Sequence, residues 1–87
     1  MLLIGSRLIG SKAIKSRNMA DINKRVGKKI RYYREKKRLT QEALAFEADL
    51  HRAYVGQIER GEKNIGIQNL EKIAKALNIK ASKFFAD

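Results

Sequence analysis

Four residues of one short predicted helix are suited to reading DNA bases, three through their side chains and a glycine through its lack of one. Arg52 opens this helix, and its guanidinium can donate two parallel hydrogen bonds to guanine O6 and N7. The methyl group of Ala53 can contact a thymine, and Gln57, one turn later, can read adenine or bind a phosphate. Glycine has a low helix propensity, but Gly56 would allow the helix to come close to the wall of the DNA groove. Together they form a small polar face that fits a DNA major groove, and the alternative is an ordinary exposed helix face.

These side chains need a rigid support, and residues 39–61 predict a helix, a tight turn and a second helix. The Thr40 hydroxyl can cap the first helix, and Gly61 can end the second in a left-handed conformation. His51 is a weaker cap than Ser or Thr, so it leaves backbone N–H groups that a phosphate could satisfy. Tyr54 is ambiguous, because its ring can enter the core while its hydroxyl reaches a phosphate. Both helices are too short to be stable alone, so they must pack through Leu44, Ala45, Ala48, Val55 and Ile58.

The charge of the chain is positive and unevenly distributed. Residues 1–40 contain 13 Lys and Arg against 2 Asp and Glu, a net charge of +11, whereas residues 41–87 contain 7 of each and are neutral. This asymmetry indicates that one end of the molecule faces a polyanion and that the other is free for protein contacts. Charge alone does not separate nucleic acid from a membrane or an acidic protein, and the two-helix pattern is what favours nucleic acid.

Composition excludes several classes of function. The 87 residues suffice for one small domain and leave no room for a separate domain that senses a small-molecule effector. Cys is absent and His51 is the only histidine, so neither a metal site nor a catalytic acid–base pair is expected. The sequence also lacks a convergent nucleophile, base and orienting residue. We therefore expect no enzymatic activity and no cofactor.

Residues 1–20 are expected to form an extension of the folded domain, which spans residues 21–87. The extension has no acidic residue and contains the near-repeat LIGSR and LIGSK. Its apolar runs are too short to span a membrane and precede its charges, unlike a signal peptide, so we expect a cytoplasmic, nucleoid-associated protein. The first interpretation is disorder, or an extension added by annotation or cloning with Met19 as the start. The alternatives are a dimer-packing arm and a DNA-binding arm that carries Arg7, Lys12, Lys15 and Arg17.

Helical patterns on both sides of the central pair make the predicted domain all-α, with five helices. The first helix is predicted to begin with Asp21 or Asn23 as its N-cap, and its apolar stripe contains Val26, Ile30 and Tyr33. Residues 65–79 form the clearest amphipathic helix, with Gly66 as N-cap and Asn78 as C-cap. The apolar positions of that helix are Ile67, Leu70, Ile73, Ala74 and Leu77.

The last predicted turn of helix, residues 80–87, places Phe84 next to Phe85. Neighbouring residues point about 100 degrees apart on a helix, so both rings can hardly enter one small core. One ring is therefore expected to face a second subunit. The candidate residues for this dimer interface are Ile67, Leu77, Ile79, Phe84 and Phe85.

Three segments resemble a known family in order and spacing. The segments are IRYYREKKRLTQEALA, YVGQIERGEKN and LEKIAKALNI, and they lie within residues 26–85, a stretch that covers about two-thirds of the chain. Residues 26–85 are similar to the lambda-repressor-like, Xre-type helix-turn-helix domain, and more narrowly to the controller proteins of restriction–modification systems. The resemblance implies a compact, five-helix DNA-binding domain.

The resemblance also implies roles for residues outside the reading face. Arg34 matches an arginine that pairs inside the domain with the glutamate of the ERG motif, here Glu59, and its forked guanidinium suits a bidentate carboxylate pair. Gln41 matches a position that touches the DNA backbone at a helix N-terminus. A second backbone clamp is implied in the loop after the reading helix, at Arg60, Lys63 and Asn64.

Two positions depart from the family's pattern. Asp49 stands where the family usually has glycine, so we expect a left-handed residue there with a modest energetic cost. His51 stands where Ser or Thr commonly caps the reading helix. Both departures are compatible with an intact fold.

The predicted function is a homodimeric, sequence-specific regulator of transcription that binds double-stranded DNA. A twofold dimer would hold two reading helices roughly 34 Å apart over a palindromic operator. The resemblance favours a restriction–modification controller that regulates its own gene and the endonuclease gene. The alternatives are a phage-type repressor and an antitoxin-like module that binds a protein toxin.

Overall fold

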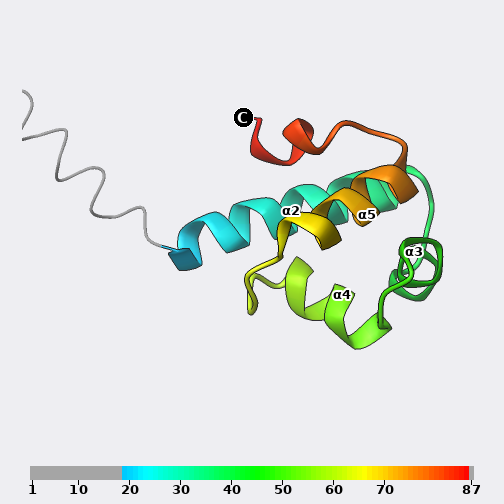
Figure 1. The fold of residues 1–87 in the computed structure, drawn as a ribbon, viewed down its shortest axis with the longest axis horizontal. Helices are drawn as coiled ribbons and strands as arrows, with labels where there is room; N and C mark the ends of the chain where they lie inside the picture. Colours follow the sequence, from blue (N-terminus) through cyan, green and yellow to red (C-terminus); the bar gives the residue numbers. More distant parts are fainter. Residues whose placement is uncertain (1–18, 87) are drawn as a thin grey trace, which may run out of the picture.

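The computed structural model describes residues 19–86, and the expectations for residues 1–18 lie outside this part of the chain. Its elements are α2 (Met19–Lys36), α3 (Gln41–Ala48), α4 (Arg52–Glu59), α5 (Ile67–Leu77) and the 3₁₀ helix η1 (Ala81–Phe85). Residues 19–86 contain no strand, so the all-α class is confirmed for this part of the chain (Figure 1).

The prediction of five helices is wrong in one respect, because the described residues form four α-helices and a short 3₁₀ helix. In η1 the N–H of Lys83 donates to the carbonyl of Lys80 at 3.0 Å, which is the i to i+3 pattern of a 3₁₀ helix. The segment has only five residues, too few for a stable α-helix of its own. It is held against α2 by its buried Phe84.

The first helix begins earlier than predicted. α2 begins at Met19, so Asp21 lies in its first turn and neither Asp21 nor Asn23 is its N-cap. An acidic residue in this turn is still favourable, because it lies near the positive end of the helix dipole. The predicted apolar stripe is present, since Val26 and Ile30 are buried and Tyr33 packs against the core.

The predicted ends of the shorter helices agree with the structure. The Thr40 hydroxyl accepts a hydrogen bond from the N–H of Ala43 at 3.0 Å and caps α3. Asp49 has φ 59° and Asn78 has φ 58°, so both adopt the left-handed conformation expected of them. His51 makes no side-chain capping hydrogen bond to α4, which leaves the first N–H groups of that helix without a side-chain cap.

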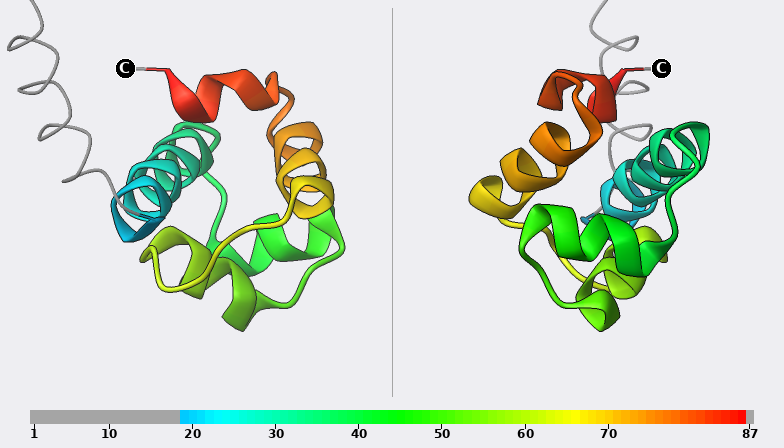
Figure 2. Two further views of the ribbon diagram at one scale, coloured as in Figure 1. Left: turned by 60° about the vertical axis from the view of Figure 1, so that its left-hand side comes forward. Right: turned by 90° about the vertical axis from the view of Figure 1, so that its right-hand side faces the viewer.

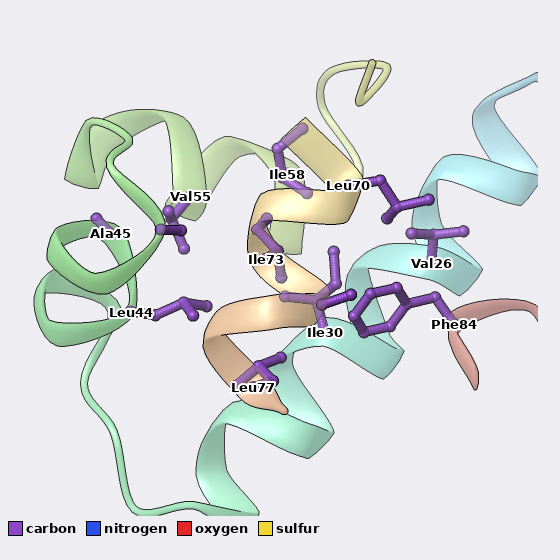
Figure 3. Close-up of a cluster of buried hydrophobic side chains, with 12 residues drawn as sticks. Val26, Ile30, Leu44, Ala45, Val55, Ile58, Leu70, Ile73, Leu77 and Phe84 are labelled. Atoms are coloured by element: carbon purple, nitrogen blue, oxygen red, sulfur yellow. The ribbon is translucent and has the colours of Figure 1, made fainter. Parts of the chain in front are cut away.

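The hydrophobic core lies between α2 on one side and α3, α4 and α5 on the other (Figure 3). Phe84 reaches this core from η1 and is 1% exposed, whereas Phe85 points outward and is 47% exposed. The two neighbouring rings therefore have separate environments, as expected. The core residues are Val26, Ile30, Leu44, Ala45, Ala48, Val55, Ile58, Leu70, Ile73, Ala74, Leu77 and Phe84.

Gly27 lets α2 and α4 meet backbone to backbone. A Cβ atom at this position would lie 2.6 Å from the carbonyl oxygen of Glu59 and closer still to that of Ile58. Any side chain here would push the two helices apart. The position of α4 on the rest of the molecule is therefore fixed by a contact between main chains.

The elements are arranged so that α3 and α4 lie at one end of the molecule and η1 at the opposite end, with α2 and α5 between them (Figures 1 and 2). After α4 the chain turns through Gly61, whose φ is 75°. The N–H of Glu62 donates to the carbonyl of Gln57 at 2.9 Å and closes the end of α4. Because α4 lies at one end of the fold, its outer face is accessible to a ligand.

Candidate nucleic-acid interface

A shallow depression of about 240 Å³ lies on the outer side of α3 and α4. Its lining contains all four residues predicted to read bases, together with two residues predicted to touch the DNA backbone. Polar and charged side chains dominate this lining, as in a surface that hydrogen-bonds a polar ligand. The lining residues are Gln41, Arg52, Ala53, Gly56, Gln57 and Arg60.

The four predicted reading residues differ in exposure. Arg52 and Ala53 are exposed, and Gln57 is half-buried. The guanidinium of Arg52 forms no ion pair with any other residue of the described chain. An unpaired cation at the front of an exposed helix is available for a ligand.

Gly56 lies on the side of α4 that faces the depression but is covered by neighbouring side chains, which refines the sequence interpretation of this residue. It is buried, and a Cβ atom on it would lie 3.1 Å from Nη1 of Arg60 and 3.5 Å from Oε1 of Gln41. Gly56 therefore forms the floor of the depression, and the side chains of Arg60 and Gln41 lie over it. Its lack of a side chain makes room for these two neighbours.

The ion pair expected between Arg34 and Glu59 is present in the interior. Nε of Arg34 donates to Oε2 of Glu59 at 2.6 Å, and Nη2 donates to Oε1 at 3.0 Å. Nη1 of Arg34 also donates to the carbonyl oxygen of Leu39 at 2.7 Å. The hydrogen bonds with Glu59 raise the pKa of Arg34 above its ordinary value, although burial acts in the opposite direction. Both side chains are buried, and the pair ties α2 to the end of α4.

The same carboxylate also holds a residue of the depression. Nε2 of Gln41 donates to Oε1 of Glu59 at 3.0 Å. Because Gln41 is the first residue of α3, this bond fixes a side chain beside the free N–H groups at the start of that helix. The amide oxygen of Gln41 lies near Gly56, so the buried pair orients one wall of the depression.

Arg60 is held by a neighbour that the sequence analysis did not single out. Its Nε and Nη2 donate to the carboxylate of Glu62 at 2.8 and 3.1 Å, and both side chains are exposed. These hydrogen bonds raise the pKa of Arg60 and lower the pKa of Glu62. The left-handed turn at Gly61 brings the two residues together, so a partner at i+2 could have been suspected from the RGE sequence.

Two other residues predicted to touch the DNA backbone, Tyr54 and Asn64, are also oriented by polar neighbours. The Tyr54 hydroxyl accepts a hydrogen bond from Nδ2 of Asn69 at 3.0 Å and keeps its own hydrogen to donate. Oδ1 of Asn64 accepts from Nδ2 of Asn23 at 2.7 Å. His51 and Lys63 are exposed. The supporting asparagines were missed because they lie far from their partners in the sequence.

The residues predicted for a dimer interface divide into two groups. Leu77 and Phe84 are 2% and 1% exposed and belong to the chain's own core, so their assignment to an interface is wrong. Ile67 is 84% exposed, Phe85 is 47% exposed, and Ile79 is half-buried. Isolated helices leave more apolar positions than one core can cover, and periodicity alone does not tell which of them remain outside.

Ile67 and Phe85 lie on one apolar groove, which also includes a residue that the sequence analysis did not predict. The groove has a volume of about 260 Å³ and runs between the first turns of α2, the start of α5 and the end of η1. Ile22 of α2 is 37% exposed and lines it together with Ile67 and Phe85. We call this surface, defined by Ile22, Ile67 and Phe85, the apolar groove.

Two further features of residues 19–86 bear on the class of site. No group of three or more His, Asp or Glu side chains in this part is placed to hold a metal ion. Likewise, none of the helices described is long and apolar enough to cross a membrane.

Comparison with protein families matches residues 30–84, well over half of the chain, to the helix-turn-helix family HTH_3. The chain belongs to this family. The match covers α3, the turn at Asp49 and α4, so these elements are the helix-turn-helix and α4 is its second helix. The identification of an Xre-type helix-turn-helix protein from the sequence is thereby confirmed.

Among helix-turn-helix proteins, the chain is similar to controller proteins. It is 52% identical to the control protein C.BamHI of Bacillus amyloliquefaciens over 61% of this chain and 67% of the relative. It is 44% identical to the control protein C.MunI of a Mycoplasma species over 79% of this chain and 95% of the relative. The crystal structure of the restriction–modification controller protein C.AhdI from Aeromonas hydrophila superposes with a TM-score of 0.71 at 41% identity, over 72% of this chain and 96% of that one.

Proposed function

We propose that the protein is a homodimeric controller that binds a palindromic DNA operator and regulates its own gene together with that of a restriction endonuclease. The observation that carries this proposal is the depression on α3 and α4, whose lining joins the predicted reading residues to two candidate phosphate contacts. The chain's membership of the helix-turn-helix family and its similarity to controller proteins support the same function.

In this proposal α4 enters the major groove and Arg52 reads a guanine. Arg52 is exposed at the first position of α4 and is the side chain of the depression best suited to a bidentate contact. Ala53 contacts a thymine methyl, and Gln57 contacts an adenine or a nearby phosphate. Gly56 forms the floor of the depression, and its lack of a side chain allows the wall of the DNA groove to come close to Arg60 and Gln41.

Phosphate contacts on both sides of α4 position the helix. On one side, Gln41 and the uncapped start of α4 at His51 offer donors at helix N-termini. On the other side, Arg60, Lys63 and Asn64 form the second clamp. The Tyr54 hydroxyl, with its hydrogen free to donate, lies between them in the sequence. These contacts carry no sequence information but determine the register of α4 on the duplex.

The apolar groove is the proposed dimer contact. Contiguous exposed apolar surface marks interaction sites, and Ile67 is almost fully exposed although it begins an otherwise amphipathic helix. A twofold axis at this surface would give each operator two α4 helices about one helical turn apart. Occupancy of the operator would then depend on protein concentration through linked dimer and DNA equilibria, without a small-molecule effector.

A selection of bound duplexes from a random DNA pool tests this function. We expect enrichment of two inverted half-sites whose centres lie about one turn, or 34 Å, apart. The selected duplex should bind at least about 10³-fold more tightly than unrelated DNA at the same salt concentration. Enrichment of a single asymmetric site, or of no sequence at all, would contradict a dimeric operator-binding regulator.

A further inference from the structure

Another hollow of the described chain lies away from the helix-turn-helix. It is a groove of about 490 Å³ between α2 and η1, and η1 lies at the end of the fold opposite α4 (Figures 1 and 2). We call it the tyrosine groove. Its lining residues are Arg25, Lys28, Lys29, Tyr32, Tyr33, Phe84 and Ala86.

Cations border this groove, and among residues 19–86 its lining contains no carboxylate. Lys28 is exposed and Lys29 is half-buried, yet neither forms an ion pair within residues 19–86. Neither ammonium group is therefore engaged by a carboxylate of this part of the chain, and both can bind an anionic ligand. A third side chain, Lys36, holds its ammonium 5.5 Å from the centre of the Tyr32 ring.

Aromatic rings form the other part of the tyrosine groove. Tyr32 is 53% exposed and contacts Tyr33 edge to face, with ring centres 5.0 Å apart. Tyr33 in turn contacts the buried Phe84 edge to face at 6.3 Å. An exposed ring is thus anchored through a second ring to the core. Such a rigid aromatic surface is suited to stacking with a flat partner.

From these two features we infer that the tyrosine groove is a second, sequence-independent site that binds single-stranded nucleic acid, with a base stacked on Tyr32 and phosphates contacted by Lys28, Lys29 and Lys36. Single strands expose the flat face of a base, which a duplex keeps inside its stack. Unpaired lysines beside an accessible ring supply both interactions that such a strand requires.

The distribution of charge favours a polyanion over the chain's own N-terminal segment. Residues 1–18 carry four Lys and Arg and no acidic residue, so they are repelled by a groove that is itself cationic. Since the tyrosine groove and the depression on α4 share no lining residue, the proposed strand would not compete with an operator on α4.

The inference can be tested with fluorescein-labelled oligothymidylate of roughly 15 nucleotides and the full-length chain, by fluorescence anisotropy at low salt. The triple variant Lys28→Gln/Lys29→Gln/Tyr32→Ala should weaken binding at least about tenfold. A matched variant, Lys72→Gln/Lys75→Gln, removes two exposed lysines of α5 and should change affinity by no more than about twofold. Circular dichroism establishes that both variants are folded.

Intrinsic fluorescence gives a second readout, because the chain contains three Tyr and no Trp. Binding of the oligothymidylate should quench tyrosine emission through stacking on Tyr32. Tyr32→Phe should keep most of the affinity, since its ring still stacks, but should lose most of the quenching. A Tyr32→Phe variant that quenches like the unmodified chain would overturn the stacking assignment.

Two further results would also overturn the inference. If Arg52→Ala/Gln57→Ala lowers affinity for the oligothymidylate as much as the triple variant does, the strand binds α4 instead. If poly-glutamate binds as tightly as the oligothymidylate and Tyr32→Ala affects neither ligand, the tyrosine groove is a site for an acidic protein. Loss of oligothymidylate binding in the triple variant alone supports the proposal.

Discussion

The side-chain amide of Gln41 donates to the carboxylate of Glu59 across 3.0 Å, and through this bond the interior of the domain orients a residue of its surface. Glu59 accepts from Arg34 at the same time, so one carboxylate joins α2, α3 and α4. Such a fully satisfied network specifies geometry as well as stability. The depression is therefore built on the buried ion pair.

The first prediction concerns this buried pair. Arg34→Met should destabilise the domain by about 3 to 5 kcal/mol, because it leaves the Glu59 carboxylate buried without its cation. Urea unfolding followed by circular dichroism measures the change. The exposed pair of Arg31 with Glu35 is the control, since Arg31→Gln should cost no more than about 0.5 kcal/mol. Equal effects of the two substitutions would show that the buried pair has no special structural role.

Gln41 should affect DNA affinity more than stability. In Gln41→Ala, Glu59 keeps both hydrogen bonds from Arg34, so the unfolding free energy should fall by only about 1 kcal/mol. Affinity should fall about fivefold for the selected operator and for unrelated duplexes alike, as expected for loss of a phosphate contact. Electrophoretic mobility shifts with both DNAs make the comparison. A loss confined to the operator would instead indicate that Gln41 contacts a base.

Arg52 should determine sequence preference. Arg52→Ala is expected to relax selection at one position of each half-site, with a loss of discrimination of about 1 to 3 kcal/mol. Repeating the random-pool selection with this variant tests the expectation, and Lys72→Ala on the exposed side of α5 serves as a control. A uniform loss across all sequences would identify Arg52 as a phosphate contact.

Glu62 should restrain DNA binding, because it holds the guanidinium of Arg60. Glu62→Gln is expected to raise affinity for DNA roughly threefold at low salt, since Arg60 is released and a negative charge is removed. Glu71→Gln removes the same charge from α5 and should have a smaller effect. If DNA affinity rises equally in both variants, the effect of Glu62 comes from the change in net charge and not from its contact with Arg60.

Acidification should reproduce part of the Glu62 effect, but only when the pH falls below the ordinary carboxyl pKa of a glutamate. The pKa of Glu62 is lowered by its hydrogen bonds with Arg60, so the pair is fully formed above the ordinary carboxyl pKa and is lost as the pH falls through the lowered value. At a pH just above the ordinary Glu pKa of about 4.3, the ion pair of Arg60 and Glu62 should therefore still be intact. Carboxyl chemical shifts from NMR would follow the titration of Glu62 directly.

Alanine substitutions of the adjacent Phe84 and Phe85 should affect different properties, the first fold stability and the second dimerisation. Phe84→Ala removes a core ring and is expected to destabilise the fold by about 3 to 5 kcal/mol. Phe85→Ala should leave thermal unfolding of the monomer nearly unchanged and raise the dimer dissociation constant. Sedimentation over a range of protein concentrations distinguishes the two effects. A Phe85→Ala variant with an unchanged association constant would exclude the apolar groove as the dimer contact.

Short-range patterns predicted most of the framework. The caps at Thr40 and Asn78 and the core stripe of α2 follow from neighbouring residues, whereas the left-handed Asp49 was expected from the family resemblance, and the structure contains each of them. The beginning of α2 was placed too late because Asp21 and Asn23 are both favourable N-cap types, although the structure includes them in the helix. The fifth helix was misjudged because five residues with mixed character do not distinguish an α-helix from a 3₁₀ helix.

Contacts between distant segments were predicted less well. The pair of Arg34 and Glu59 was expected only because the sequence resembles a known family, whereas the bonds from Asn23 and Asn69 had no local signal. Burial at Gly56 and Leu77 depends on how whole helices pack, and helical periodicity does not report that. The sequence therefore identified the members of the depression better than it identified their orientation.

The backbone contact at Gly27 has a consequence for how DNA is recognised. Because α4 rests on α2 main chain to main chain, no side-chain rotation can tilt it to suit a given duplex. Such a preorganised reader loses little conformational entropy on binding. Adjustment must then come from the DNA, through bending and changes in groove width. Operators would consequently be distinguished in part by the flexibility of base pairs that no side chain touches.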